Sequence, residues 1–224
     1  MSPVPDKMCV AADTVAVRCA GQSAPEVLLI ERAFEPYEGC WAFPGGFVEL
    51  EEDLPVAARR ELKEETGLEA VSIDQVGAWG TPGRDPRGRT VSAVYLAAAR
   101  VEESEVEGAD DATRAAWHSL DEMPSLAFDH AEILPAALNH LRNLCERTHF
   151  AFSFLPESFT ETDLRRVLES LGAVNPARNA RELLSASLVS QSGQGSPYRL
   201  NVSRYKTLLR EPVFIFPVGQ LAGE

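Results

Sequence analysis

Long apolar runs are missing from this sequence of 224 residues, and none approaches the roughly 18 residues that a membrane-spanning helix requires. Residues 1–7 lack a basic segment followed by an apolar stretch, so we expect no secretion signal. Cysteine is scarce and scattered, without the paired spacing of disulfides or metal sites, which indicates free thiols in a reducing compartment. The four are Cys9, Cys19, Cys40 and Cys145. We therefore expect no membrane partner and a cytoplasmic location.

Basic residues are also few, with 21 Lys and Arg against 34 Asp and Glu and a net charge of -13. This balance argues against a nucleic-acid binder as a whole, because such proteins depend on phosphate contacts. The charge is uneven, since residues 150–224 hold eight basic and seven acidic side chains, which leaves -14 for residues 1–149. We interpret this asymmetry as two domains, 1–149 and 150–224.

One segment, residues 46–68, has an unusual spacing of glycine and charged residues. Gly46 is followed after five residues by Glu52, and after seven more by Arg60. Three further glutamates, at positions 61, 64 and 65, have helical spacing and therefore crowd one side of a helix. Such an oxygen cluster suits a hard divalent cation, Mg²⁺ or Mn²⁺, which in turn binds phosphate oxygens. A merely solvated acidic face is the alternative, but a chance match to the nine fixed positions is on the order of one in a million.

This skeleton matches the Nudix box at every defining position, and the chain resembles the Nudix hydrolase superfamily. The resemblance implies an α/β/α sandwich with a mixed sheet, and hydrolysis of a nucleoside diphosphate linked to another moiety. Arg60 and Glu52 resemble the pair that braces the box helix, and simple salt bridging is the alternative for both. The metal ligands implied by the resemblance are Gly46, through its carbonyl, Glu61, Glu64 and Glu65.

The sequence of the first domain predicts alternating strands and helices. Runs of β-branched and apolar residues predict strands, and the box helix has Pro55 in its first turn and Gly67 at its end. The expected strands are 14–19, 27–32, 41–46, 70–79 and 90–98; the expected helices are 54–66 and 129–145; and 117–120 begins a short element.

The loop 81–89 packs three arginines and two glycines into an acidic domain. Guanidinium groups bind phosphate bidentately, so Arg84, Arg87 and Arg89 are candidate substrate contacts. A plain hairpin loop with solubilising charge is the alternative. With segments 41–49 and 126–134, this loop is similar to ADP-ribose pyrophosphatases, which makes ADP-ribose the favoured substrate. Those two segments supply Trp41 and His130 as further candidates, although a helix-start residue is the more ordinary role for His130.

An acidic stretch precedes Trp117. Nudix enzymes often take a general base or a further metal ligand from a loop at this place, and Asp110 and Asp111 are the candidates. A flexible acidic loop is equally compatible with the composition. Glu64 or Glu65 could also accept the proton of the attacking water without any loop residue.

The sequence of the second domain predicts two helices, 164–172 and 175–186. Two strands, 188–190 and 198–201, and a helix near 203–210 are expected to follow. This order resembles the winged helix-turn-helix of Nudix-related transcriptional regulators, which sense ADP-ribose or a similar ligand and bind DNA. DNA is therefore a candidate partner, supported by Arg178 and Arg181 on the second helix. The weak positive charge and Glu182 argue against it, and dimerisation or a lid over the active site is the alternative use. Relatives are commonly homodimers.

Overall fold

The structure is a computed structural model that describes residues 7–19, 24–100, 106, 112–185, 188–193 and 195–208. Two compact units make up the chain: unit 1 contains Met1–Arg18 and Glu26–Ala137, and unit 2 contains Cys19–Pro25 and Leu138–Glu224. The boundary between the units falls inside a helix, and the domain boundary at 149/150 stays a prediction. Within the described residues, no helix combines the length and the apolar character needed to cross a membrane.

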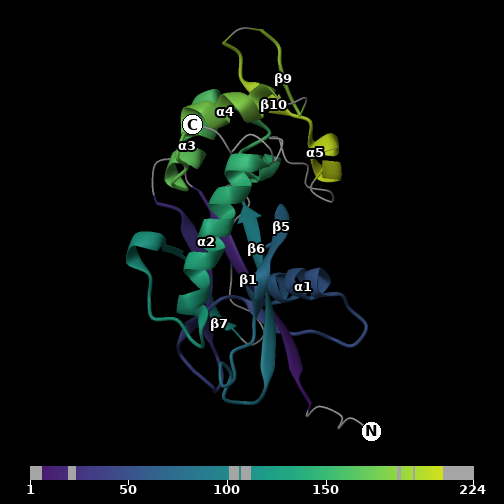
Figure 1. Cartoon of the computed structure of the whole chain (residues 1–224), viewed down its shortest axis with the longest axis vertical. Helices are drawn as coiled ribbons and strands as arrows, with labels where there is room; N and C mark the ends of the chain where they lie inside the picture. The colour runs from purple at the N-terminus through teal and green to yellow at the C-terminus, as the bar shows by residue number, and fades with distance from the viewer. Residues whose placement is uncertain are drawn as a thin grey trace, which may run out of the picture. The chain divides into compact units, whose positions relative to one another are not determined.

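Unit 1 is built on a seven-stranded mixed sheet, ordered β3-β2-β1-β6-β5, with β4 paired to β1 and β7 paired to β2 (Figure 1). The central strand β1 runs parallel to β6 and antiparallel to β2, which confirms the mixed α/β fold. The strands are β1 Cys9–Arg18, β2 Glu26–Arg32, β3 Trp41–Ala42, β4 Gly45–Phe47, β5 Ser72–Trp79, β6 Thr90–Ala99 and β7 Ala112–Ser119.

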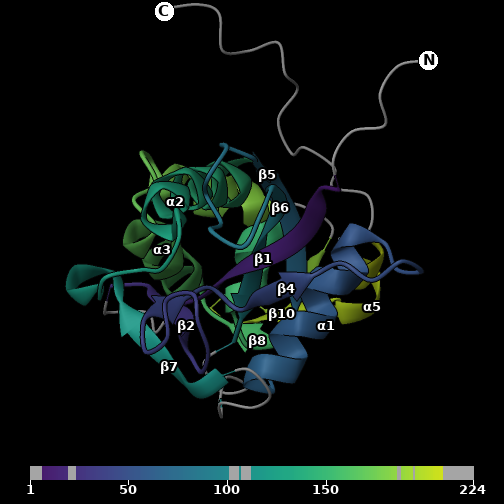
Figure 2. The same ribbon diagram turned by 90° about the horizontal axis from the view of Figure 1, so that it is seen from below.

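Residues 11–17 of β1 are all buried, as expected for a strand with neighbours on both edges and cover on both faces. Figure 2 shows α1 (Leu54–Thr66) and the first turns of α2 (His130–Arg147) on opposite sides of the sheet. Alternate residues of β1 therefore point toward different helices. Ala12 and Ala16 belong to the clusters that include residues of α1.

Helix α1 has the bounds that the box predicts. Asp53 caps its start by accepting a hydrogen bond from the Leu54 N–H, and Pro55 lies in its first turn. Gly67 ends the helix with φ 72°, a left-handed conformation that costs glycine least, and its N–H donates to the Lys63 carbonyl. Leu62 is fully buried against the sheet, which contributes about 1.5–3 kcal/mol to stability. The acidic side of α1 is therefore held in a fixed orientation.

One expectation about unit 1 is wrong. Residues 117–120 do not begin an element, because Trp117 lies near the end of the eight-residue strand β7, and Leu120 starts the 3₁₀ turn η2 (Leu120–Glu122). The strand starts at Ala112, directly after residues 107–111, which lie outside the described part of the chain.

Unit 2 has the predicted order of two helices, a hairpin and a short helix. Thr160 and Asp163 form a reciprocal capping box at the start of α3 (Glu161–Ser170), and the buried Tyr205 hydroxyl is 2.5 Å from Ser153 Oγ. The three-stranded sheet is ordered β8-β10-β9. The elements are η3 His149–Phe154, β8 Ser158–Phe159, α3 Glu161–Ser170, α4 Pro176–Ser185, β9 Val189–Gln191, β10 Tyr198–Leu200 and α5 Val202–Leu208.

Candidate functional site

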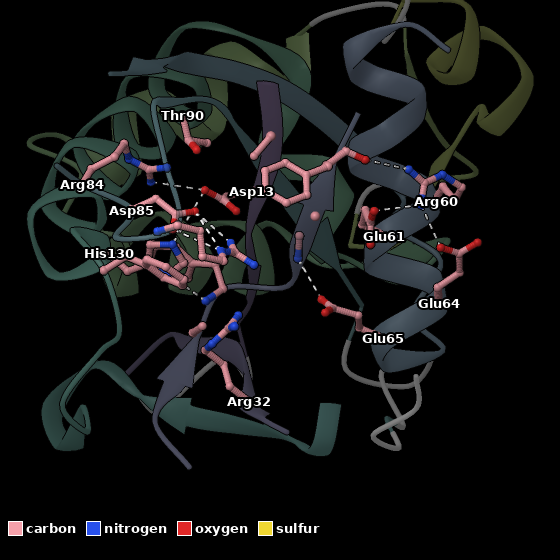
Figure 3. Close-up of a pocket in the computed structure, with 18 residues that line it drawn as sticks. Asp13, Arg32, Arg60, Glu61, Glu64, Glu65, Arg84, Asp85, Thr90 and His130 are labelled. Carbon is pink, nitrogen blue, oxygen red and sulfur yellow. Dashed lines mark hydrogen bonds and ion pairs between the residues drawn. The ribbon is translucent and has the colours of Figure 1, made fainter. Parts of the chain in front are cut away.

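A cavity of about 350 Å³ lies within unit 1 (Figure 3). Its wall comes from β1, β4, α1, the loop between β5 and β6, and the start of α2. The volume falls in the usual range for small-molecule sites. The cavity has a carboxylate end, formed by Glu61, Glu64 and Glu65 of α1, and an arginine end, formed by Arg84, Arg87 and Arg32.

At the carboxylate end, glycines allow the β4 backbone to approach α1. A Cβ added at Gly46 would overlap the Glu61 carboxylate, so any larger residue would push the two apart. The Gly45 N–H donates to Glu65 Oε2 at 2.8 Å, and Glu65 is buried. Gly46 therefore lies directly against Glu61, and Gly45 against Glu65.

Arg60 holds the remaining carboxylates together. Its Nη1 donates to Glu61 Oε1 at 2.8 Å and to Glu64 Oε2 at 2.9 Å, and its Nη2 donates to Glu52 Oε1 at 2.5 Å. The hydrogen bond with Glu52, followed by those with Glu61 and Glu64, raises the pKa of the Arg60 guanidinium well above its ordinary value. Burial raises the pKa of Glu61 despite this neighbour, so its charged form is costly and a further cation would stabilise it.

The donor set fits a hard divalent cation, because three carboxylates and the Gly46 carbonyl offer only oxygen ligands. In the described part of the chain, no three His, Cys, Asp or Glu side chains already converge on one point that could hold a metal ion. The Arg60 guanidinium instead stands between Glu61 and Glu64 as their common positive partner. A metal ion there would replace or share that contact.

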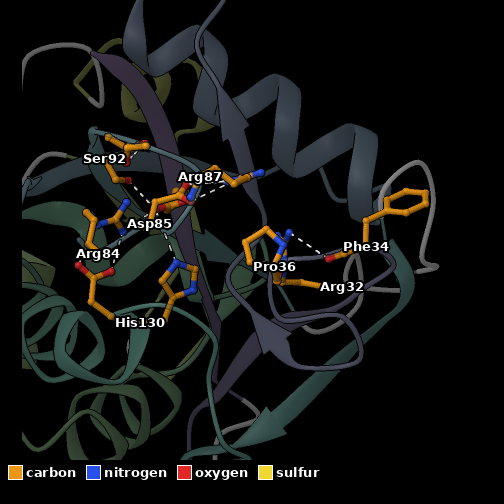
Figure 4. Close-up of polar contacts among 12 residues, drawn as sticks. Arg32, Phe34, Pro36, Arg84, Asp85, Arg87, Ser92 and His130 are labelled. Atoms are coloured by element: carbon orange, nitrogen blue, oxygen red, sulfur yellow. Dashed lines mark hydrogen bonds and ion pairs between the residues drawn. The ribbon is translucent and has the colours of Figure 1, made fainter. Parts of the chain in front are cut away.

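The arginines of the 81–89 loop have different environments. Arg84 is buried and donates to both oxygens of Asp129, at 2.8 and 2.6 Å, and its Nη2 lies 3.5 Å from Asp13. Burial opposes its charge, but these two carboxylates outweigh that effect and raise the pKa of Arg84. Arg84 therefore joins the loop to the start of α2. Arg87 is 46% exposed in its side chain and pairs with the buried Asp85 at 2.8 Å (Figure 4).

His130 lies in the cavity wall and is buried. Its Nδ1 accepts a hydrogen bond from the Phe43 N–H at 3.0 Å, so the proton of the neutral ring is on Nε2. That Nε2 lies 3.7 Å from Asp13 Oδ2, and the ring stacks on Phe43 with centroids 4.6 Å apart. His130 thus packs against Phe43 and also lines the cavity.

Two candidates from the sequence do not line this cavity. Trp41 packs edge-on against His118, with ring centroids 4.3 Å apart, and Arg114 lies over its ring. Arg89 donates to the Thr90 carbonyl at 3.3 Å. Asp110 and Asp111 lie outside the described residues. A role for any of these four in the reaction stays a prediction.

Several lining residues were not anticipated. Asp13 is buried in the middle of β1, and Ser92 Oγ donates to its Oδ2 at 2.5 Å. Burial disfavours its charge, but the nearby His130 ring, the hydrogen bond from Ser92 and the charge of Arg84 lower the pKa of Asp13. A lone acid inside an apolar strand is a signal that the sequence did contain. Phe47 and Phe128 gave no such signal, because aromatic residues near a loop usually indicate packing.

Comparison with known proteins agrees with this geometry. The NUDIX domain family matches residues 9–137. An ADPR responsive transcriptional repressor, NtrR, from Acinetobacter baylyi is 30% identical over 210 residues, covering 91% of this chain and 84% of that protein. An ADP-ribose pyrophosphatase from Methanocaldococcus jannaschii is 43% identical over 109 residues, covering 49% of this chain and 63% of that protein. Shewanella oneidensis NrtR complexed with a 27mer DNA superposes with a TM-score of 0.71 at 25% identity, covering 88% of this chain and 95% of that one.

Proposed function

The chain belongs to the NUDIX domain family as a Nudix-type pyrophosphohydrolase, and we propose that it cleaves ADP-ribose into AMP and ribose 5-phosphate. The main support is the cavity itself, in which Glu61, Glu64 and Glu65 line one end and arginines the other. The negative charge of a diphosphate must be neutralised by cations or basic side chains. A nucleoside diphosphate sugar therefore needs an elongated site in which acidic and basic side chains are both present. The pyrophosphatase from M. jannaschii supports the choice of ADP-ribose.

In this proposal, Glu61, Glu64, Glu65 and the Gly46 carbonyl hold Mg²⁺ or Mn²⁺. Bound divalent cations would neutralise the diphosphate oxygens and make the attacking water more acidic. Water attacks one phosphorus, the P–O bond to the bridging oxygen breaks, and the bridging oxygen leaves with the other phosphate. Arg60 keeps the glutamates oriented through its contacts with Glu61 and Glu64.

A carboxylate must accept the proton of that water. We propose Glu64, because its side chain is 45% exposed and accessible to water, whereas Glu65 is buried. Asp110 or Asp111 is the alternative base. The Glu64→Gln variant separates these alternatives: if Glu64 is the base, the acid limb of the pH–rate profile disappears in that variant. If an aspartate is the base, the limb remains in Glu64→Gln and disappears in Asp110→Asn or Asp111→Asn.

The proposed substrate is tested with a panel of nucleoside diphosphate sugars, NADH and dinucleotide polyphosphates in the presence of Mg²⁺. We expect the highest kcat/KM for ADP-ribose, with AMP and ribose 5-phosphate as products. Faster turnover of another member of the panel would contradict the choice of substrate, and no turnover of any member would contradict the enzymatic proposal.

A second candidate function is a DNA-binding regulator that responds to ADP-ribose. It is supported by the repressor from A. baylyi, whose likeness spans both units, and by the order α3, α4, β9, β10 of a winged helix. On α4, Arg178 pairs with Glu182 at 2.7 Å, and Arg181 donates to the Ala177 carbonyl. Both contacts are at the surface and could yield to phosphates, although the near-neutral charge of residues 150–224 weakens the case.

A gel-shift assay with DNA from upstream of the chain's own gene, with and without ADP-ribose, tests the regulator. We expect Arg181→Ala to abolish any shift while leaving hydrolysis unchanged. A winged-helix unit retained for dimerisation, or as a lid over the active site, would give no shift in either case. We further propose a homodimer in the cytoplasm; the four free cysteines favour a reducing compartment, and light scattering tests the dimer.

A further inference from the structure

Two phenylalanines from different segments face the arginine end of the cavity. Phe47 belongs to β4, directly after the box glycine, and is 43% exposed although it is large and apolar. Phe128 lies in the loop before α2 and also lines the cavity. Packing with unit 1 does not account for an exposed ring at a cavity wall, whereas contact with a ligand would.

The Arg87 guanidinium contacts both rings. Its Cζ is 5.0 Å from the centroid of Phe47 and 5.8 Å from that of Phe128. Asp85 accepts hydrogen bonds from Arg87 Nε and Nη2, and these contacts raise the pKa of Arg87. The Arg87–Asp85 pair is close to neutral as a unit, so Arg87 attracts phosphate less than an unpaired arginine would. What it presents to the two rings is a flat, delocalised group, comparable in shape to part of a nucleobase.

Phe128 adopts an uncommon backbone conformation, with φ 53°. A bulky residue in the left-handed region costs about 1–3 kcal/mol, and such residues cluster at functional sites. The position of its ring is also fixed by neighbours: Arg32 Cζ is 5.0 Å from its centroid, and the Tyr37 ring packs edge-on at 4.8 Å. The backbone is therefore held in an unfavourable state that keeps the aromatic ring at the cavity.

We propose that Phe47 and Phe128 form a stacking site for the nucleobase of the substrate, and that Arg87 fills this site in the free protein. Binding exchanges the guanidinium for the base, which stacks on the same rings. The diphosphate then extends toward the carboxylate end. This inference rests on the proposed function, which supplies a nucleoside diphosphate as the ligand. It goes further by assigning Phe47 and Phe128 to recognition of the base.

Isothermal titration of AMP and of ribose 5-phosphate into the full chain, without divalent metal, tests the proposal. Both ligands have a sugar phosphate, but only AMP has a base. We expect Phe128→Leu to weaken AMP binding by about 5-fold to 150-fold, the range for one base–aromatic stack, and to leave ribose 5-phosphate binding unchanged. Phe34→Leu is the matched control, because Phe34 is 61% exposed and does not line the cavity. Equal effects of Phe128→Leu on both ligands, or none on AMP, would overturn the stacking site.

Arg87→Ala tests the placeholder role. If the guanidinium only fills the site, its removal raises the affinity for AMP, since the base no longer displaces it. If Arg87 binds phosphate instead, AMP and ribose 5-phosphate lose affinity together, and that part of the proposal is wrong. These titrations require no hydrolysis. A turnover assay can therefore contradict the enzymatic proposal without contradicting the stacking site, and a titration can contradict the stacking site without contradicting the enzymatic proposal.

Discussion

Replacing Glu65 by Gln removes one negative charge from the carboxylate end while retaining the shape of the side chain. In the structure, Glu65 Oε2 accepts the Gly45 N–H at 2.8 Å. The glutamine carbonyl can accept the same hydrogen bond, although a bond to a neutral acceptor is weaker than one to a carboxylate by about 1 kcal/mol. For a chain of this length, such a loss lowers the melting temperature by about 2–4 °C. The fold therefore survives the substitution.

The effect on turnover should be much larger. Glu65 is a proposed cation ligand, and its loss should lower kcat for ADP-ribose by about 10²-fold to 10⁴-fold, similar to the loss of a group that acts directly in the reaction. The assay measures AMP by reverse-phase chromatography at several Mg²⁺ concentrations, alongside circular dichroism and thermal melting. Glu69→Gln is the matched control, because Glu69 is an exposed partner of Lys63 just beyond α1 and does not line the cavity.

Three outcomes can follow from the two variants. A large loss in Glu65→Gln with full activity in Glu69→Gln supports the assignment. A wild-type rate in Glu65→Gln at every Mg²⁺ concentration would refute the reasoning, because the charge would then have no part in catalysis. A large drop in melting temperature in Glu65→Gln would show that the side chain is mainly structural, which contradicts the small effect calculated from its hydrogen bond with Gly45.

Other predictions concern stability and the bracing of the site. Arg60→Gln should lower kcat/KM by about 10-fold to 100-fold, as for other residues that orient metal ligands, and raising Mg²⁺ should recover part of the rate. Asp13→Asn should lower the free energy of unfolding by about 1–3 kcal/mol at neutral pH. Because the pKa of Asp13 is lowered by folding, this difference between wild type and variant should shrink in melts as the pH falls below the ordinary carboxyl value. Leu62→Ala should cost about 2–5 kcal/mol in denaturant titrations, since Leu62 is fully buried; a loss below this range would mean that α1 packs loosely.

The sequence predicts helix α1 to the residue because its signals are local. Pro55 and Gly67 mark its ends, and the spacing of the glutamates fixes its period. The pairing of β1 with β6 has no local signal, since parallel neighbours are joined through long connections. The start of β7 was missed for a similar reason, because acidic residues that predict a loop precede Ala112.

The candidate site likewise contains some residues that local spacing predicts and others that only the tertiary fold brings together. The proposed metal ligands Glu61, Glu64 and Glu65 lie within one helix, so helical spacing alone places them on the same side of α1. The arginine loop gives three equal candidates in the sequence, yet Arg84 pairs with Asp129, which is 45 residues away. That contact depends on the tertiary fold: both Arg84 and Arg87 line the cavity, but Arg84 is buried and held by Asp129, whereas Arg87 is half-exposed. The aromatic pair, Phe47 and Phe128, could not be found from spacing, because β4 and the loop before α2 meet only in the folded unit.

We propose above that the glutamates of α1 hold a divalent cation. Electron paramagnetic resonance tests it directly, because Mn²⁺ loses its aqueous signal when it binds a protein. We predict saturable Mn²⁺ binding by the wild-type chain and its loss when Glu61, Glu64 and Glu65 are all replaced by Gln. Equal Mn²⁺ binding by the triple variant, or no binding by the wild-type chain, would contradict the account.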